Sequence, residues 1–551
     1  MNAKELPARP SLEHYKKQAK DLLKSCKSGD SGAVQRVKSH HPRFSKLPDS
    51  GTLPGVALAD VQFAIAREHG FESWPKFAKE IERLNTQTFV AGIGDPVAAF
   101  IQAACVPFDG SSHASGNLDR AEAILAAHPG IAGENMFAAA ILGDDAGVRR
   151  FLALDAKNAT RQGGPYGWDA LTYLCFSRYL RLDRTRSGGF VGAARALLDA
   201  GANPNGGWFE KEHQPEPVWE SVLYGAAGVA HHAELTRLLL ERGADPNDGE
   251  TPYHTPESYD NEALKVLVES GKLSEPNLAM MLVRKTDWHD YEGIKWMLEC
   301  GVDPNSRVPS ASTALHHAVL RDNSTKIFEL LLDHGADPTL SASSARYWGP
   351  VSPQRTGVAL AARRGRSDLL ELFEKRGFAV ELDGVDSLIA ACARNDSQGV
   401  RAIVEQEPHL VGELLKSGGT LLAEFAGVGN EPGMRQLLDL GVDAGALFGE
   451  RDPYFDITET STPLHVAAWR ARPAAVKLLI ERGAPVNALD GKDRSALALA
   501  VRACVDSYWT NRRTPESVQA LLEAKSSVEG VKFPSGYAEV DDLLRRHGMK
   551  E

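Results

Sequence analysis

The chain has 551 residues, of which 43% are hydrophobic and 25% charged, and its formal net charge is −11. This length exceeds what one compact core usually holds, and the negative charge argues against nucleic acid or an anionic membrane as the main partner. Aromatic residues are sparse, at 7%, and alanine and leucine fill the apolar positions, which favours helices over sheets.

Targeting and redox signals point to the cytoplasm. The stretch Met1–Pro10 carries Lys4, Glu5 and Arg9 and lacks the apolar segment of a signal peptide. No run approaches the roughly 20 apolar residues that a membrane span needs. The six cysteines lie far apart without a CxxC pair, which argues against a zinc site or a disulfide framework. We therefore expect a cytoplasmic protein.

The first 88 residues are expected to form a helical N-terminal cap. Ser11–Lys27 has the pattern of a charged amphipathic helix, and its lysines are mixed with acidic residues, as on a solvated helix face. Leu58–His69 and Trp74–Leu84 are predicted to pair as two helices, with Ser73 as an N-cap. Thr86–Asp95 is predicted to be a short linker.

One phrase, Gly-Ala-Asp-Pro-Asn, returns along the rest of the chain. Its copies begin at Gly201, Gly243, Gly301 and Gly335, with weaker copies at Gly441 and Gly483. Some gaps are near one repeat of about 33 residues, and longer gaps suit degenerate copies or long loops.

Two short amphipathic helices are predicted before each copy. In residues 461–487, Thr462 can cap a helix, Pro463 suits its first turn, and Gly483 supplies the left-handed stop after the second helix. The buried faces are expected to consist of Leu464, Ala467 and Ala468 in the first helix, and of Ala475, Leu478 and Leu479 in the second. Helices this short bury their apolar faces only by stacking on neighbouring pairs.

These features resemble the ankyrin repeat. Residues 462–465 spell Thr-Pro-Leu-His, the TPLH motif of that family, and residues 313–316 spell Thr-Ala-Leu-His. The resemblance implies that the motif is structural and that its imidazole bonds the backbone of adjoining turns, here at Thr313, His316, Thr462 and His465. Residues 65–75 resemble an N-terminal segment found on bacterial ankyrin-repeat proteins.

The resemblance implies an all-α fold. We expect an α-solenoid of about a dozen ankyrin-type helix-turn-helix repeats, with long finger loops, over residues 89–551 after the helical cap of residues 1–88. Residues 251–276 depart from the pattern, and Tyr537–His547 is predicted to be a polar terminal helix.

The sequence offers no catalytic constellation. His231-His232 lacks the spacing of a zinc-binding HExxH helix, and residues 287–290 (Asp-Trp-His-Asp) fall in an expected turn. His40-His41 with His69 is a similar weak cluster. No phosphate-binding loop, dinucleotide fingerprint or nucleophile elbow is present. We expect no cofactor, no metal and no enzymatic activity.

Three long finger loops carry paired aromatic residues. The pairs are Trp208 and Phe209, Tyr347 and Trp348, and Tyr454 and Phe455. In one interpretation they are binding anchors, since Trp and Tyr dominate interface hot spots. In the other, the loops fold back and the rings pack within the protein, which only orders the loops.

The leading hypothesis is a monomeric, non-catalytic scaffold that binds a protein partner through its concave face and finger loops, without nucleic acid or membrane. The alternatives are a metal-dependent enzyme and a secreted effector on the same solenoid. The metal alternative requires three His, Asp or Glu side chains from different repeats to converge within metal distance, which only a structure can show.

Overall fold

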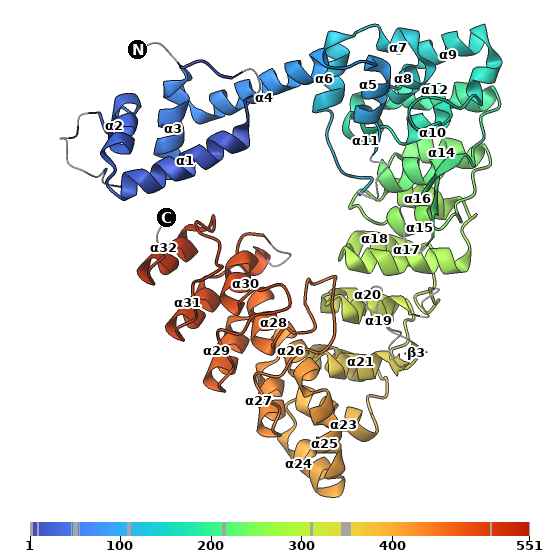
Figure 1. Ribbon diagram of the computed structural model, residues 1–551. Coiled ribbons are helices and arrows are strands. Elements are labelled where there is room, and N and C mark those ends of the chain that lie inside the picture. Colours follow the sequence, from blue (N-terminus) through green and yellow to red (C-terminus); the bar gives the residue numbers. More distant parts are fainter. Residues whose placement is uncertain are drawn as a thin grey trace. The chain divides into compact units, whose positions relative to one another are not determined.

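The computed structural model describes residues 4–7, 10–45, 47, 53, 55–106, 112–211, 216–308, 312–342, 354–506 and 510–549. The chain forms two compact units, Met1–Asp245 and Pro246–Glu551, which we call the N-terminal and C-terminal units. Both consist of short helices, and the strands in the described ranges belong to two small antiparallel hairpins (Figure 1). The predicted all-α repeat fold is confirmed.

The N-terminal unit begins with four helices that share a hydrophobic core. They are α1 (Leu12–Lys27), α2 (Ser31–His40), α3 (Leu58–Glu68) and α4 (Trp74–Ala91). Ser11 caps α1, Ser73 caps α4 as predicted, and Tyr15 packs edge to face on Phe77 inside the core. The linker expected at Thr86–Asp95 is wrong in its first half, because α4 continues through it. The boundary between the two compact units follows Asp245 in the sequence. The domain boundary predicted after residue 88 stays a prediction.

Helix pairs and one hairpin make up the rest of the N-terminal unit. The elements are α5 (Pro96–Ala104), α6 (Asp119–Ala127), α7 (Ile131–Glu134), α8 (Met136–Ile141), α9 (Asp145–Leu154), α10 (Ala170–Cys175), α11 (Arg178–Leu182), α12 (Ser187–Asp199), β1 (Gly207–Glu210), β2 (Val218–Ser221), α13 (Val222–Tyr224) and α14 (Ala233–Glu241). Helix α10 packs on α8, and α12 packs on α9 and α14, so neighbouring pairs cover one another's apolar faces.

The C-terminal unit is also built from stacked helix pairs. Its elements are α15 (Glu250–His254), α16 (Glu262–Glu269), α17 (Glu275–Asp287), α18 (Tyr291–Glu299), α19 (Ala314–Leu320), α20 (Thr325–Asp333), β3 (Ser341–Ala342), β4 (Arg355–Thr356), α21 (Gly357–Arg363), α22 (Ser367–Lys375), α23 (Gly384–Ala393), α24 (Ser397–Gln406), α25 (His409–Lys416), α26 (Gly418–Val428), α27 (Glu431–Asp439), α28 (Pro463–Trp469), α29 (Pro473–Glu481), α30 (Ala496–Ala503), α31 (Glu516–Glu523) and α32 (Ala538–Arg546). The first helices of successive repeats form an inner row in which α19 contacts α17 and α21, and α28 contacts α26 and α30.

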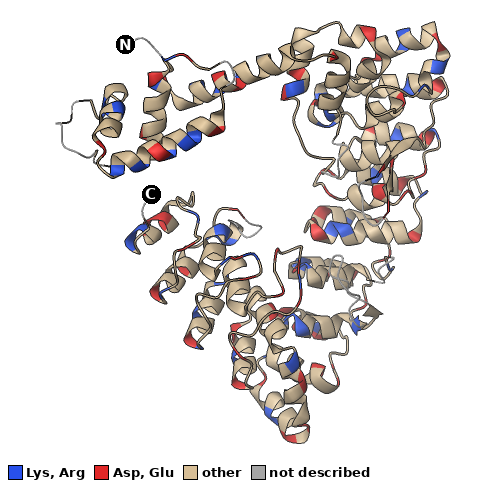
Figure 2. Ribbon diagram, in the orientation of Figure 1, with Lys and Arg blue, Asp and Glu red and all other residues tan. Residues whose placement is uncertain are grey.

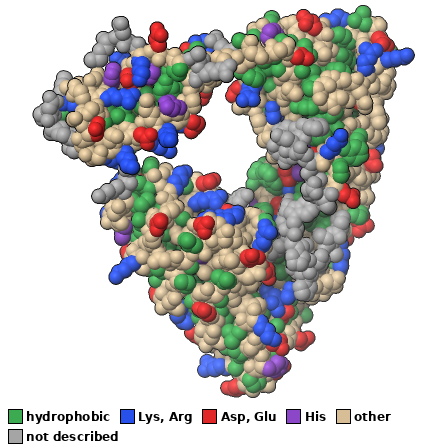
Figure 3. Space-filling model, viewed as in Figure 1, with side chains coloured by type: hydrophobic (Ala, Val, Ile, Leu, Met, Phe, Trp, Pro, Cys, Tyr) green, Lys and Arg blue, Asp and Glu red, His purple; other side chains and the backbone are tan. Residues whose placement is uncertain are grey.

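Positions of basic and acidic residues are interspersed along the helices of each unit (Figure 2), and side chains of both signs are spread over the face shown in Figure 3. The lysines of α1 are exposed among acidic residues, as expected of a solvated face. None of the helices in the described ranges combines the length and the apolar character that crossing a membrane requires.

The local signals of residues 461–487 produce the predicted helix pair. Thr462 caps α28, whose first residue is Pro463, and the apolar residues predicted for both buried faces are buried. Gly483 follows α29 with a φ of 84°, a left-handed conformation that glycine adopts without strain. Short local patterns therefore account for this repeat.

The histidines of the TPLH-like motifs bridge adjoining turns. His316 Nδ1 lies 2.8 Å from the Thr313 hydroxyl, and its Nε2 lies 3.0 Å from the Arg355 carbonyl. His465 contacts the Thr462 hydroxyl in the same way, and its Nε2 lies near two carbonyls of the next turn. The structural role implied by the family resemblance fits this geometry.

The asparagine that ends the repeated phrase joins each turn to the next one. Asn305 Nδ2 donates to the Gly335 carbonyl at 2.8 Å, and its Oδ1 accepts from the Asp337 N–H at 2.9 Å. The same pair of bonds recurs between Asn205 and Gly243 and Asp245, and between Asn247 and Lys272 and Ser274. We call this arrangement the asparagine clamp. It explains why the phrase ends in asparagine.

Replacing Asn305 by alanine removes both bonds of one clamp. We expect Asn305→Ala to lower the free energy of unfolding by about 1–3 kcal/mol, because a backbone donor and a carbonyl lose their partners. Urea denaturation followed by circular dichroism measures this change. Thr339→Ala is the matched control, because Thr339 occupies the same position of its repeat but bonds only within its own turn, to Asp337. Equal losses in the two variants would contradict the clamp.

Candidate functional site

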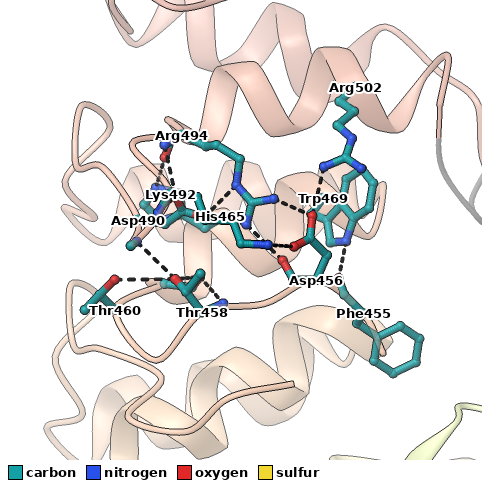
Figure 4. Close-up of polar contacts among 12 residues, drawn as sticks. Phe455, Asp456, Thr458, Thr460, His465, Trp469, Asp490, Lys492, Arg494 and Arg502 are labelled. Atoms are coloured by element: carbon teal, nitrogen blue, oxygen red, sulfur yellow. Dashed lines mark hydrogen bonds and ion pairs between the residues drawn. The ribbon is translucent and has the colours of Figure 1, made fainter. Parts of the chain in front are cut away.

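The long finger loop before α28, residues 445–461, folds back onto the inner helices of the C-terminal unit. Phe455 is only 1% exposed and lies in a hydrophobic cluster with Val466 and Trp469 of α28 and Leu499 of α30. The indole N–H of Trp469 donates to the Phe455 carbonyl at 2.6 Å (Figure 4). The ring of Phe455 therefore anchors the loop to its own repeat.

Asp456 fixes the same loop to the following repeat. Its carboxylate contacts Lys492 Nζ and Arg494 Nη1 at 2.5 Å and Arg502 Nη1 at 2.9 Å (Figure 4). Partial burial acts to raise the pKa of Asp456, but the hydrogen bonds from Lys492, Arg502 and Arg494 outweigh it and lower the pKa below its ordinary value. The carboxylate stays ionised and holds the loop.

Tyr454 reaches an earlier repeat of the C-terminal unit. Its hydroxyl donates to the Asp287 carbonyl, at the end of α17, at 2.6 Å. The Arg321 guanidinium lies 4.1 Å from the centre of the Tyr454 ring, and the Arg470 guanidinium lies 4.4 Å from that of Phe455. These are cation–π distances, so the loop also covers buried arginines.

Buried ion pairs connect the ends of the inner helices beneath the loop. Asp287 pairs with Arg284, with Arg321 at 2.5 Å and with His317 at 2.8 Å. Burial acts to raise the pKa of Asp287, but His317 and the two arginines lower it far below its ordinary value. A second network joins the buried arginines Arg364 and Arg470 to Asp322 and Glu424. Carboxylates engaged in this way are structural.

A cleft of about 970 Å³ opens beside the loop. Its lining includes Tyr259, Trp288, His289, Tyr454 and Arg512. Tyr259 is 67% exposed and packs edge to face on Trp288 at a ring distance of 5.5 Å, while its hydroxyl donates to the Trp288 carbonyl at 2.9 Å. The rim of the cleft thus presents an ordered aromatic pair to solvent.

Arg512 contributes a positively charged side chain to the lining of this cleft. Burial lowers the pKa of Arg512, and repulsion from Arg366 lowers it further. Burial and repulsion from Arg512 likewise lower the pKa of Arg472 to about 10. Arginines that repel one another in this way favour a ligand that brings negative charge. The cleft combines aromatic and cationic side chains, which are the types enriched at protein interfaces.

The aromatic pair of the N-terminal unit lies on a hairpin with two different faces. Trp208 of β1 is 4% exposed and packs against Trp168 at a ring distance of 5.0 Å. Phe209, the next residue, is 53% exposed and contacts Trp219 of β2 at 4.7 Å. Trp208 therefore orders the hairpin, whereas Phe209 is accessible.

The other predicted site residues fall into two groups. Tyr347 and Trp348 lie outside the described residues. Trp208, Tyr454 and Phe455 pack within the protein, as in the second interpretation of the finger loops. A binding role for the six aromatic residues stays a prediction.

The weak histidine clusters have local structural roles. His232 caps α14, accepting from the Leu235 N–H at 3.1 Å. His69 Nδ1 contacts the Lys4 carbonyl at 2.8 Å, and its ring stacks on Phe77. Residues 287–290 form the turn between α17 and α18, as predicted, and Asp290 caps α18.

A charged triad lies beside the cleft, on and just after α15. His254 Nε2 is 3.1 Å from Glu250, and its Nδ1 is 3.1 Å from Glu257. Burial lowers the pKa of His254, but the two carboxylates outweigh it and raise the pKa to about 9. The ring is thus an imidazolium that donates to both sides.

Sequence reasoning did not single out Tyr259 and noted Trp288 only as part of an acidic turn. Both residues lie in turns between the two helices of successive repeats. A large aromatic residue in a turn that is otherwise polar was the signal available for finding them.

Comparisons with known proteins bear on the fold. The ankyrin-repeat family model matches residues 312–342 and 461–491, which hold α19–α20 and α28–α29. Among solved structures, the crystal structure of the human ASB11 ankyrin repeat domain is similar, with 20% sequence identity over 44% of this chain and 96% of that chain and a TM-score of 0.19. No curated protein matches the sequence.

The raised pKa of His254 predicts a pH dependence of stability. The folded pKa of about 9 exceeds the ordinary value of 6.5, so the stabilisation is complete below pH 6.5 and is lost as pH rises through 9. We expect the wild type to be more stable than His254→Gln at pH 6. The difference between their free energies of unfolding should be about 1–3 kcal/mol larger at pH 6 than at pH 10. Urea denaturation at both pH values measures this difference. A difference independent of pH would contradict the triad.

Proposed function

This chain is an ankyrin-repeat protein, and we propose that it is a non-catalytic scaffold that binds another protein through the inner-helix face and finger loops of its C-terminal unit. The observation that carries the proposal is the cleft lined by Tyr259, Trp288, Tyr454 and Arg512. Its walls are held by ion pairs and by the folded-back loop, so a partner meets a preformed surface and binding orders few side chains.

The chemistry of the cleft favours a particular kind of partner segment. Tyr259 and Trp288 offer a flat apolar surface with hydrogen-bonding groups at its edge, which suits an apolar or aromatic side chain. The guanidinium of Arg512, in the lining of the cleft, suits a carboxylate of the partner. We therefore propose that the partner inserts a segment in which an apolar residue is close to an acidic one.

The state of the polar groups supports binding over catalysis. Asp287 and Asp322 are engaged by arginines, and His254 is an imidazolium between two carboxylates. A general base requires a group that can accept a proton near neutral pH. Asp287 and Asp322, which line the cleft, are committed to ion pairs, and this supports a role in recognition for them.

The cysteines and the net charge support a proposal for the compartment and the class of partner. The cysteines in the described ranges are free thiols, and all but Cys300 are buried, which suits a reducing compartment. The net charge of −11 disfavours nucleic acid. We propose a cytoplasmic monomer with a protein partner, and Phe209 as a second accessible contact in the N-terminal unit.

Removing the aromatic pair tests the cleft directly. We expect the double variant Tyr259→Ala/Trp288→Ala to lose at least about tenfold in affinity for a protein partner, because central aromatic residues dominate interface energies. The partner is identified by affinity capture of wild type from the native host and mass spectrometry. Its affinity for each purified variant is then measured by calorimetry.

Leu489→Ala provides the control for this experiment. Leu489 is an exposed apolar residue of the same unit that does not line the cleft, so its variant should bind like wild type. Melting temperatures of all variants show whether the fold is retained. Unchanged affinity in the double variant, with a lowered melting temperature, would mean that the aromatic pair only stabilises the turns.

A further inference from the structure

Three metal-ligating side chains converge inside the N-terminal unit. They are His113, from the loop between α5 and α6, Glu210 of β1 and Glu220 of β2. Their ligand atoms lie within 4.8 Å of one another, and all three side chains are more than nine-tenths buried. Sequence reasoning expected no metal, because these residues are far apart and follow no motif.

The strand register explains why the two carboxylates share a face. In the β1–β2 hairpin, Trp208 is paired with Glu220, and Glu210 is paired with Val218. Glu210 and Glu220 are therefore diagonal neighbours on the buried face, while Phe209 and Trp219 occupy the exposed face. The hairpin presents both carboxylates to His113, with Nε2 4.0 Å from Glu210 and Nδ1 4.0 Å from Glu220.

A tyrosine hydroxyl and three aromatic rings surround His113. Its Nδ1 lies 2.9 Å from the Tyr224 hydroxyl, and the rings of Trp208, Tyr224 and Phe176 lie around it. A metal-bound histidine typically donates its other N–H to a fixed oxygen, which sets its tautomer. Tyr224 also stands where α13 passes into a π-helical turn, a local irregularity that is frequent at functional sites.

We propose that His113, Glu210 and Glu220 bind a divalent transition-metal ion, with Zn²⁺ as the best fit. Two carboxylates and a neutral imidazole carry a charge of −2, which a divalent cation balances. Nitrogen and carboxylate oxygen are both good zinc ligands, at about 2.0–2.2 Å. The three ligand atoms would therefore move toward one another on binding, by rotation of their side chains. His113 Nε2 is the nitrogen that we assign to the ion.

The second histidine with two carboxylates in this chain shows what distinguishes the site. At His254, each ring nitrogen is 3.1 Å from one carboxylate, so the ring is protonated and separates the two acids. At His113, each ring nitrogen is 4.0 Å from one carboxylate, Nδ1 is closer to the Tyr224 hydroxyl at 2.9 Å, and one ligand atom from each of the three residues lies within 4.8 Å of the other two. The first arrangement is an ion-pair triad, whereas the second resembles a set of metal ligands.

The position of the proposed ion implies a structural role. It would join His113, which precedes α6, to a hairpin about a hundred residues later, and closing so long a stretch of chain restricts the unfolded state. The buried ion would face aromatic rings, and it would fix the orientation in which Phe209 and Trp219 face solvent. This role adds to the proposed scaffold function and does not depend on it.

Zinc titration of the full-length chain tests the proposal. After chelator treatment and desalting, we expect wild type to take up one equivalent of Zn²⁺, measured by calorimetry and elemental analysis, and to melt at a higher temperature with zinc. Glu210→Gln and Glu220→Gln keep the side-chain shape but remove the charge, and each should weaken binding by more than about 100-fold. Glu250→Gln, from the His254 triad, is the matched control and should bind like wild type.

Spectroscopy keeps the test decisive if a variant fails to fold. X-ray absorption of the zinc-loaded wild type should show one imidazole nitrogen and oxygen ligands without sulfur. Tyr224→Phe should keep this ligand set and lower the affinity by about 10–100-fold, as expected of a positioning residue. The proposal is overturned if wild type shows no saturable Zn²⁺ binding, if sulfur ligands appear, or if both glutamine variants bind like wild type.

Discussion

The asparagine clamp is the interaction that fixes the stacking of the repeats whose turns end in Asn205, Asn247 and Asn305. Each repeat offers two short helices, too short to be stable alone, so its apolar faces must be covered by neighbours at a fixed spacing. Asn305 supplies that spacing, because its amide donates to one backbone group of the next turn and accepts from another. Side chains from adjacent repeats also satisfy helix-end carbonyls, as Arg364 does for Leu320 and Arg472 for Gly427.

A regular stack leaves the irregular loops as the variable part of the molecule. The loop 445–461 follows this logic, since Tyr454, Phe455 and Asp456 each make their contact on a different repeat. Together they bring the loop onto the inner helices and shape one side of the cleft. Ankyrin-type finger loops are expected to project from the repeats. A loop that makes three such contacts is instead more stable when it packs on the helices of its own protein. The recognition surface is then formed by turns as well as by fingers.

The sequence allowed the helices to be predicted wherever the signals are local. Thr462, Pro463 and Gly483 fix the ends of α28 and α29 without reference to the rest of the chain. The contact of Tyr454 with Asp287, 167 residues earlier, depends on the curvature of the stack, which no local pattern contains. The linker predicted at Thr86–Asp95 is wrong in its first half, because α4 continues to Ala91 and packs on α6. Long-range packing therefore determines both the Tyr454 contact and the length of α4.

A comparison of two acidic sites sharpens the interpretation of the N-terminal unit. Asp456 is one carboxylate that faces three cationic side chains of the chain itself, so its charge is neutralised within the fold. Glu210 and Glu220 are two carboxylates that converge on an imidazole, and their register on one hairpin forces them together. Two carboxylates and an imidazole that converge on one point form a set of ligands that suits a divalent cation. A divalent ion at that point would hold the hairpin in place. The irregular loops of both units would then be ordered by charge, with side-chain cations in one and a metal in the other.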